Sequence, residues 1–490
     1  MGINFSRLLS LKYGNVISNY LNTRYTVISV GRVMTCVLGM IVRREREIRQ
    51  FVKTPFYRVV SMLDCQGSEL EGEFRAVEGS DWYLSPKLYK ENGFKEKKDA
   101  EELIRCLSVS QPMQAVVEKM ERKNENKNPP LLFNLAELQN ECSRLFKVSP
   151  DETLKIVQEL YEKKLVTYPR TDARVLSTAV AKEIYKNIRG LCSFEPTGAF
   201  AAEILENGSY KKITSTRYVN DKQITYHSAI IPTGQGLGAL KSVSARSAKV
   251  YELIARRFLS VFYPAAVYKK VSMVTMMGKE RFFSACKVLD QEGYLKVANV
   301  KKNGEEQKDR AMLLQLQTLK KGSILPVKSL DIKEGETAPP KRYNSGSMIL
   351  AMENAGQLIE DEELREQIKG SGIGTSATRA EILKKLISNK YIALNKKTQI
   401  LTPTLLGEMI FDVVSVSIRS LLNPELTASW EKGLTYVAEG TITSEEYMNK
   451  LNHFVRTRTD AVLHMNQHIA LREYFDASAR YYKKPSKAKA

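Results

Sequence analysis

Apolar and polar residues between positions 150 and 164 repeat with the period of an amphipathic helix. Apolar side chains recur at the spacing that buries one helical face: Leu154, Val157, Leu160 and Tyr161. Ser149 and Pro150, with Glu152 just inside, form a helix start signal. The pattern therefore predicts a helix over residues 150–164.

Pro169 marks the end of this helical pattern. A proline cannot continue a helix, and it favours an extended backbone in the residue before it. We therefore expect residues 166–168 to form a short strand or loop that leaves the helix. In such a run the Tyr168 hydroxyl points outward, with Arg170 beside it on the same face.

Two stretches of strand-like alternation flank this helical region. Residues 56–64 and 72–78 form the first stretch, and residues 267–290 form the second. This order predicts one β-rich domain interrupted by a helical insertion, and hence an α+β fold with several domains. The charged, breaker-rich residues 119–130 are predicted to be a linker.

Residues 335–470 carry a mainly helical pattern. Three glycines precede one of the expected helices: Gly370, Gly372 and Gly374. The N-terminal end of that helix, near Ser376 and Thr378, would expose backbone N–H groups that can hold a phosphate. A glycine-rich turn is also a common helix cap, and the pattern alone leaves both interpretations open.

The charge balance indicates a polyanionic partner. The 490 residues include 75 Lys and Arg against 55 Asp and Glu, which gives a net charge of +20. Ribosomal and membrane-surface proteins share such a balance, so charge alone does not choose among them. Residues 471–490 are basic and too polar to fold, and we predict a disordered tail with at most nonspecific contacts to nucleic acid.

The apolar segments and the cysteines limit where the protein can be located and which metal or disulfide sites it can contain. No run of about 18 apolar residues occurs, and the N-terminal residues lack a signal-peptide pattern. The sequence therefore predicts a cytoplasmic protein with no membrane partner. The six cysteines are scattered without a CxxC pair, which argues against a zinc ribbon and against a disulfide framework.

Tyr168 is the candidate nucleophile. A phenol with a pKa of about 10 is a poor nucleophile at neutral pH, so it needs a nearby cation or base to attack phosphorus. Arg170 offers a permanent charge that can stabilise a phenolate and a transferring phosphate. The alternative from the local pattern is a half-buried strand tyrosine beside a surface arginine.

Residues 131–177 resemble the active-site region of the type IA DNA topoisomerases, particularly the topoisomerase III branch. Their sequence is LLFNLAELQNECSRLFKVSPDETLKIVQELYEKKLVTYPRTDARVLS. Further blocks agree with the family in the same order: ISVGRVMTCVLGMIVRREREIRQF (28–51), TYHSAIIPTGQ (225–235), VYELIARRFLSVFYP (250–264), PPKRYNSGSMILAMENAG (339–356), GSGIGTSATRAEILKKLISNKYI (370–392) and LLNPELTASWEKGL (421–434). The resemblance extends to about residue 460.

This resemblance implies a toroid core built from helical or winged-helix-like domains and a β-rich arch, without the family's N-terminal Toprim domain. The implied parts are a helical DNA-groove domain (1–54 and 336–470), a β arch (55–127 and 251–335), a catalytic tyrosine domain (128–250) and the basic tail (471–490).

The resemblance also assigns roles to individual residues. The catalytic set is Tyr168, Arg170 and His227. The supporting set is Gln158, Glu162, Thr167, Thr171 and Asp172. The DNA-binding set is Ser29, Arg32, Gly374, Thr378 and Arg379. Asp172 is expected to orient Arg170 or to fix the loop, and Glu162 to hold the loop from below. The sequence departs from the usual family residues at Met34, Cys36, Ala173, Ser228, Ser345 and Ser376.

The implied function is that of an isomerase that needs no ATP. It cleaves and rejoins single-stranded DNA through a 5′-phosphotyrosine at Tyr168, passes a strand and relaxes negative supercoils. The family's Toprim domain supplies a glutamate for proton transfer and an Asp-x-Asp-x-Glu set for Mg²⁺, and this sequence contains no Asp-x-Asp. No metal ligands are assigned here. We expect cleavage to need a Toprim domain that this chain lacks, and a separate Toprim-bearing chain and a helicase are the partners that the resemblance allows.

Other classes of protein remain open from the residues. An inactive remnant or split subunit would act as a single-stranded DNA-binding protein. A tyrosine recombinase carries His-x-x-Arg before its nucleophile, which His453 and Arg456 match ahead of Tyr474 and Tyr481. A relaxase with a His-hydrophobe-His pair is disfavoured, because none of the four histidines forms one.

Overall fold

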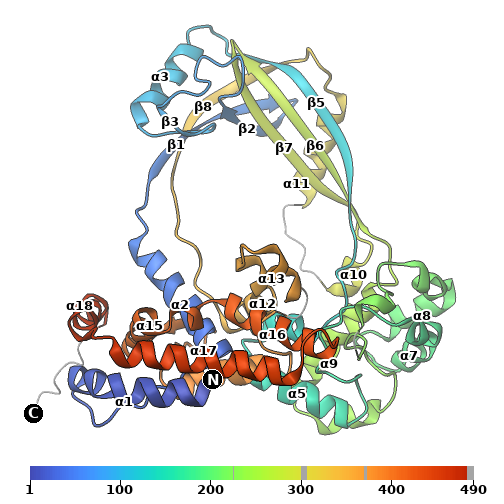
Figure 1. Cartoon of the computed structure of the whole chain (residues 1–490). Coiled ribbons are helices and arrows are strands. Elements are labelled where there is room, and N and C mark those ends of the chain that lie inside the picture. The colour runs from blue at the N-terminus through green and yellow to red at the C-terminus, as the bar shows by residue number, and fades with distance from the viewer. Residues whose placement is uncertain (225, 300–305, 369–371, 483–490) are drawn as a thin grey trace, which may run out of the picture.

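The computed structural model describes residues 1–224, 226–299, 306–368 and 372–482. Its ribbon traces a ring in which a β-sheet lies opposite two groups of helices (Figure 1). Each of these three parts has its own cluster of buried apolar side chains.

An antiparallel sheet of eight strands forms the part farthest from the chain termini (Figure 1). Its strands are β1 (Pro55–Cys65), β2 (Ser68–Arg75), β3 (Leu88–Lys90), β4 (Gly93–Phe94), β5 (Gln114–Lys127), β6 (Ala266–Met277), β7 (Glu280–Gln291) and β8 (Ile324–Glu336). The strand order is β2-β7-β6-β5-β8-β1-β4-β3. Because β2 also pairs with β1, the strands from β2 to β1 in this order form a closed ring, and β4 and β3 extend from β1 outside it. The helices α3 (Lys97–Leu107) and α11 (Glu306–Thr318) accompany the sheet.

The prediction of a linker over residues 119–130 is wrong. Residues 119–127 continue β5, and they pair with β6 from Lys119 opposite Val274 to Lys127 opposite Ala266. Backbone pairing does not depend on side-chain charge, and the charged side chains of this strand face solvent. The true chain breakers are Pro129 and Pro130, which follow the end of β5.

The segment between β5 and β6 forms the first group of helices. Its elements are α4 (Leu135–Phe146), α5 (Pro150–Glu162), α6 (Thr178–Lys182), α7 (Ile184–Leu191), α8 (Gly198–Asn207), η1 (Ser209–Ser215), η2 (Asp221–Gln223), η3 (Leu237–Ser242) and α9 (Ala245–Ser260), with α10 (Leu295–Ala298) added after β7. Leu160, Ile230 and Phe258 belong to its buried cluster. This core therefore holds α5 and α9 against the segment around residue 230.

The two ends of the chain together form the second group of helices. Its elements are α1 (Gly2–Leu21), α2 (Arg32–Gln50), α12 (Ser345–Glu353), η4 (Ala355–Leu358), α13 (Glu362–Gln367), α14 (Arg379–Ser388), β9 (Ile392–Leu394), β10 (Leu401–Pro403), α15 (Leu405–Ser417), η5 (Arg419–Leu422), α16 (Pro424–Ala438), α17 (Ser444–His464) and α18 (His468–Ala479). Its buried cluster joins side chains such as Val37, Met352 and Val413. Among the helices in the described part of the chain, none combines the length and the apolar content that crossing a bilayer requires.

The predicted disordered tail begins too early. Residues 471–479 belong to α18, and Leu471 and Phe475 are both 0% exposed. These two apolar side chains lie four positions apart, so one helical face packs into the core and offsets the entropy of ordering. Residues 483–490 lie outside the described residues.

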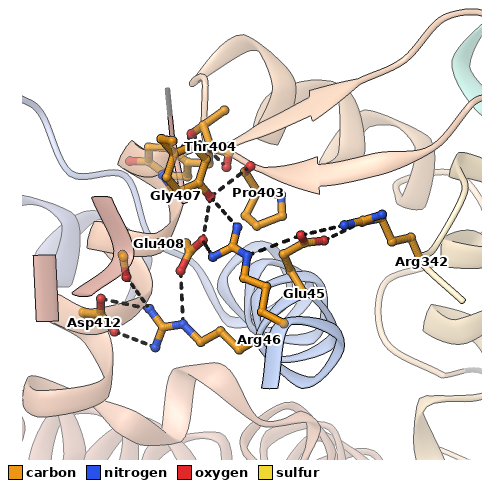
Figure 2. Close-up of polar contacts among 12 residues, drawn as sticks. Glu45, Arg46, Arg342, Pro403, Thr404, Gly407, Glu408 and Asp412 are labelled. Carbon is orange, nitrogen blue, oxygen red and sulfur yellow. Dashed lines mark hydrogen bonds and ion pairs between the residues drawn. The ribbon is translucent and has the colours of Figure 1, made fainter. Parts of the chain in front are cut away.

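A buried cluster of ionic groups fastens α2 to α15 (Figure 2). Arg46 and Arg49 of α2 bind Glu408 of α15, with N–O distances of 3.1 Å and 2.6 Å, and Glu408 is 0% exposed. The Tyr482 hydroxyl donates to the same carboxylate, and Arg46 also contacts Asp412 at 2.9 Å. Burial raises the pKa of the Asp412 carboxyl, and Arg46 opposes that rise. Every acceptor in this cluster thus depends on a cation from a different helix.

Replacing Glu408 with glutamine is expected to lower the free energy of unfolding of this helical part by about 1–3 kcal/mol, because buried donors of Arg46 and Arg49 lose a charged acceptor. Thermal and denaturant unfolding measure the change. Glu336→Gln is the matched control: the Lys53–Glu336 pair is exposed (60% and 57%), and such pairs contribute about 0–1 kcal/mol. Equal stability of the Glu408→Gln variant and the wild type would contradict the prediction.

Candidate active site

The predicted helix before the candidate nucleophile is confirmed as α5. Its first turn is capped by Ser149, whose side chain accepts a hydrogen bond from the Glu152 N–H, and Pro150 occupies the first turn. The helix ends at Glu162, two residues earlier than predicted, and Lys164 has a left-handed backbone (φ 60°). The chain therefore turns sharply between the helix and Tyr168.

The loop that carries Tyr168 lies antiparallel to residues 227–233. The Thr167 N–H donates to the Ile231 carbonyl at 3.0 Å. The Thr167 hydroxyl donates to the Ala229 carbonyl and accepts from the Ile231 N–H, both at 3.0 Å. The Thr171 hydroxyl donates to the His227 carbonyl at 2.9 Å. Thr167 and Thr171, two of the predicted supporting residues, thus fix the backbone on both sides of Tyr168.

The Tyr168 ring lies between two other aromatic rings. Its centroid is 4.5 Å from that of His227, with a tilted geometry, and 5.4 Å from that of Tyr161, which approaches edge-on. Tyr168 is half-buried, whereas His227 and Arg170 are exposed. Within the described residues, neither the Tyr168 hydroxyl nor the Arg170 guanidinium has a hydrogen-bond or ion-pair partner, so both are available to an incoming group.

Tyr161 is a site neighbour that the sequence analysis missed. The helical pattern placed it among the buried positions of α5, but it is 38% exposed and its ring contacts that of Tyr168. Two other predicted supporting residues lie on the same helix: Gln158 donates to Glu162 at 3.0 Å, in an exposed pair. Their spacing of four residues places both side chains on one face of α5.

Asp172 has a different partner from the one expected. Its carboxylate accepts from the Arg379 guanidinium at 3.2 Å, and no contact with Arg170 accompanies it among the described residues. Of the two roles expected for Asp172, this hydrogen bond matches the one in which Asp172 fixes the loop rather than the one in which it orients Arg170. Arg379 comes from the start of α14, so this ion pair joins the tyrosine loop to the second group of helices.

Arg379 is fully buried rather than placed at a DNA surface. Its side chain is 0% exposed, and it also lies 3.8 Å from Glu353 at the end of α12. Burial raises the pKa of the Glu353 carboxyl, and Arg379 opposes that rise. The expectation that Arg379 contacts DNA does not match this structure, because its guanidinium is buried and faces the carboxylates of Asp172 and Glu353.

Asn134 completes this group, and sequence reasoning did not find it. Its side-chain amide donates to Glu353 at 2.7 Å and to the Asp172 carbonyl at 3.1 Å. Its amide oxygen also caps α4 by accepting from the Glu137 N–H. In the sequence, Asn134 is recognisable only as a residue that can cap the start of a helix. Its contacts with Glu353 and Asp172 join distant parts of the chain and leave no trace in the local sequence pattern. Asn134, Asp172, Glu353 and Arg379 are called the interdomain cluster below.

The glycine-led segment before α14 is shaped by close packing. Gly372 and Gly374 have φ values of +66° and +69°. A Cβ on Gly372 would lie 2.2 Å from the Met352 carbonyl oxygen, so the chain passes tightly over the end of α12. The Thr378 hydroxyl accepts from the Thr375 N–H at 3.0 Å and does not cap the helix. Gly370 lies outside the described residues.

The remaining two DNA-contact candidates lie at the start of α2. Arg32 is paired with Glu431 at 3.3 Å and keeps 31% of its side chain exposed. The Ser29 N–H donates to the Tyr391 hydroxyl at 2.8 Å. Arg32 is thus reachable from solvent, and an anion bound there has to compete with Glu431.

The family's Mg²⁺ finds no ready set of ligands near Tyr168. Within residues 1–224, 226–299, 306–368 and 372–482, no group of three or more His, Cys, Asp or Glu side chains is arranged to hold a metal ion. The residues described here therefore do not fit that cofactor.

Comparisons with known proteins identify the family of this chain. A family model described as DNA topoisomerase matches residues 1–449. A DNA topoisomerase 3 of Bacillus subtilis is 31% identical over 473 residues, which cover 95% of this chain and 59% of that protein. A DNA topoisomerase 3 of Bacillus licheniformis gives the same identity and coverage. The chain spans 59% of the length of these two relatives.

A solved structure shows the same fold. Full-length topoisomerase I from Thermotoga maritima is 25% identical, with a TM-score of 0.61, and the match covers 93% of this chain and 67% of that one. The chain therefore belongs to the DNA topoisomerase family. Within that family it is a type IA, topoisomerase III-like protein, and the predicted α+β toroid core is confirmed.

Proposed function

We propose that this chain is the strand-cleaving core of a type IA topoisomerase, with Tyr168 as the nucleophile and single-stranded DNA as the substrate. The observation that carries the proposal is the position of the Tyr168 ring, which packs at 4.5 Å from His227 on a loop fixed by Thr167 and Thr171. Arg170 is exposed two residues away in the same loop. The contact between the phenol and the imidazole, with an exposed arginine in the same loop, supports the proposal that these three side chains act on one phosphate.

In the proposed reaction the Tyr168 oxygen attacks a backbone phosphorus and the bond to the 3′ oxygen breaks. The products are a 5′-phosphotyrosine and a free 3′-hydroxyl. Arg170 and His227 stabilise the negative charge that develops on the phosphoryl oxygens. Attack by the 3′-hydroxyl on the phosphotyrosine reverses the step, so strand passage and the relaxation of negative supercoils need no ATP.

The departing 3′ oxygen must receive a proton, and general acid catalysis of this kind contributes about 10²- to 10⁴-fold. We assign that acid to the glutamate of a Toprim domain, which acts either as part of the same polypeptide or as a separate Toprim-bearing partner. The same domain would hold the family's Mg²⁺, and none of the steps above depends on a metal bound by this chain. A helicase partner remains a prediction that is based on the family resemblance alone.

The test is a cleavage assay on single-stranded oligonucleotides labelled at either end. The chain is incubated alone and with a separately produced Toprim domain of a type IA topoisomerase, and the covalent adducts are trapped by denaturation. We expect adduct yield to rise by about 10²-fold or more with the added domain. We expect the 3′ label to remain with the protein, because the protein is joined to the 5′ end of the downstream fragment.

Two results would overturn the proposal. Retention of the 5′ label would indicate a 3′-phosphotyrosine, as a tyrosine recombinase forms. Tight binding of the strand without any adduct in either mixture would favour a single-stranded DNA-binding role. Equal yields with and without the Toprim domain would leave Tyr168 as nucleophile but reject the assignment of the acid to a Toprim domain.

A further inference from the structure

Tyr226 is the most exposed large apolar side chain among the described residues, with 86% of its surface accessible. A tyrosine is usually at least partly buried in a folded protein, because its ring is large and apolar. Within the same described residues, Tyr226 has no aromatic, hydrogen-bond or ion-pair partner in the chain. Such a ring is available to a ligand.

Tyr226 immediately precedes His227, whose ring contacts Tyr168. Successive Cα atoms lie about 3.8 Å apart, so the backbone of Tyr226 is held next to that of the residue whose ring contacts the nucleophile. Tyr161, which contacts Tyr168 from the other side, is also exposed at 38%. Two exposed tyrosines thus belong to the segments that carry the ring neighbours of Tyr168: Tyr161 is such a neighbour itself, and Tyr226 is next in sequence to His227.

We propose that Tyr226 is a stacking surface for a nucleobase that flanks the cleaved linkage of an unpaired strand. This inference rests on the proposed function, since it takes Tyr168 as the attacking group and DNA as the ligand. A backbone linkage can reach a half-buried phenol only if the neighbouring bases leave their stack, and an exposed ring beside the phenol replaces the lost stacking. Aromatic platforms combined with positive charge are the usual means of holding unpaired nucleic acid, and this chain carries a net charge of +20.

The stacking surface also has a consequence for substrate choice. Every base presents an aromatic face, so Tyr226 accepts all four bases, with preference set by stacking strength rather than by hydrogen bonds. Tyr226 thus positions the strand without reading a sequence. Its removal is expected to weaken binding of strands of every sequence and to leave double-stranded DNA binding unchanged.

The experiment measures the affinity of the Tyr168→Phe protein for a short strand by fluorescence anisotropy at one fixed salt concentration. This parent lacks the attacking hydroxyl, so no cleavage occurs during the measurement. Adding Tyr226→Ala is expected to weaken binding about 5- to 150-fold, the factor that corresponds to about 1–3 kcal/mol of stacking. Tyr226→Phe keeps the ring and is expected to bind within about twofold of the parent.

An abasic site placed at each position of the strand in turn locates the stacked base. At one position the abasic strand is expected to bind the parent as weakly as the intact strand binds the Tyr226→Ala protein. Combining this abasic strand with the Tyr226→Ala protein is expected to weaken binding no further than either change alone. Tyr83→Ala is the matched control. Tyr83 is 48% exposed and lies in the sheet part of the chain, between β2 and β3, so its removal is expected to leave binding unchanged.

Additive losses at every position, or a Tyr226→Ala protein that binds like its parent, would overturn the stacking role. So would a Tyr226→Ala defect seen only in the presence of the added Toprim domain, which would make Tyr226 a protein contact. A different result would overturn the proposed function: the wild-type protein would form no covalent adduct. That result does not depend on how the abasic strands bind to the Tyr226 variants.

Discussion

The Tyr168→Phe protein is expected to form no covalent adduct with single-stranded DNA, under conditions in which the Toprim-supplemented wild type forms one. The substitution removes only the hydroxyl that would attack phosphorus. The ring contacts with His227 and Tyr161 need no hydroxyl and should remain. Affinity for the strand is therefore expected to change by less than about twofold and stability by less than about 0.5 kcal/mol.

Tyr161→Phe is the matched control for this loss. It removes a hydroxyl from the same group of rings but leaves that of Tyr168 in place, so the adduct should persist. Adduct formation by the Tyr168→Phe protein would show that another residue is the nucleophile. Loss of the adduct in both variants, with unchanged unfolding curves, would instead indicate a shared requirement for both hydroxyls.

The second large effect is expected at Arg379. Replacing it with methionine deprives Glu353, whose side chain is only 14% exposed, of the cation that opposes its burial most strongly. Breaking a buried pair from one side costs about 3–5 kcal/mol. The contact to Asp172 adds less, because that carboxylate is 39% exposed and is screened by solvent. Denaturant unfolding measures the loss, and a fall in adduct yield should accompany it, since the tyrosine loop loses an anchor.

The pH dependence of this defect has a predictable sign. Burial raises the pKa of Glu353, and removing the Arg379 cation is expected to raise it further. A neutral Glu353 needs no counter-charge, so the difference in stability between the variant and the wild type should shrink as the pH falls towards that raised pKa.

Lys384→Met is the control for the Arg379 substitution. Lys384 lies on α14 as well, but its side chain is exposed, with only a surface contact to Glu381 at 3.7 Å. Its loss should change stability by less than about 0.5 kcal/mol. If both variants lost similar free energies of unfolding, the interdomain cluster would contribute no more to stability than an exposed surface contact.

Local features of the fold could be predicted well from the sequence. Ser149 and Pro150 fix the start of α5 because a cap depends only on neighbouring residues. The alternation in residues 267–290 indicated strands, and β6 and β7 occupy that stretch. The antiparallel run beside Tyr168 could not be derived from either local pattern alone, and the family resemblance was needed to bring His227 to the same site.

The failures have a common physical cause. Arg379 at a glycine-led helix start was expected to meet a phosphate, but its surroundings are set by Glu353 and Asp172, which come from distant parts of the chain. Residues 119–127 have the composition of a linker, yet β6 supplies hydrogen-bond partners to their backbone. In both cases long-range tertiary partners override the local tendency.

The interdomain cluster has a topological consequence. The first group of helices is linked covalently to the second group by way of the strands of the sheet, whereas Asn134 and Asp172 contact Glu353 and Arg379 directly through side chains. The two groups of helices, which lie side by side in the ring of Figure 1, therefore meet through noncovalent contacts, and these also include the buried hydroxyl pair of Ser143 and Ser345 at 3.2 Å. Separating the two groups of helices along this seam would break side-chain contacts but no peptide bond, and it would leave the backbone hydrogen bonds within each helix intact.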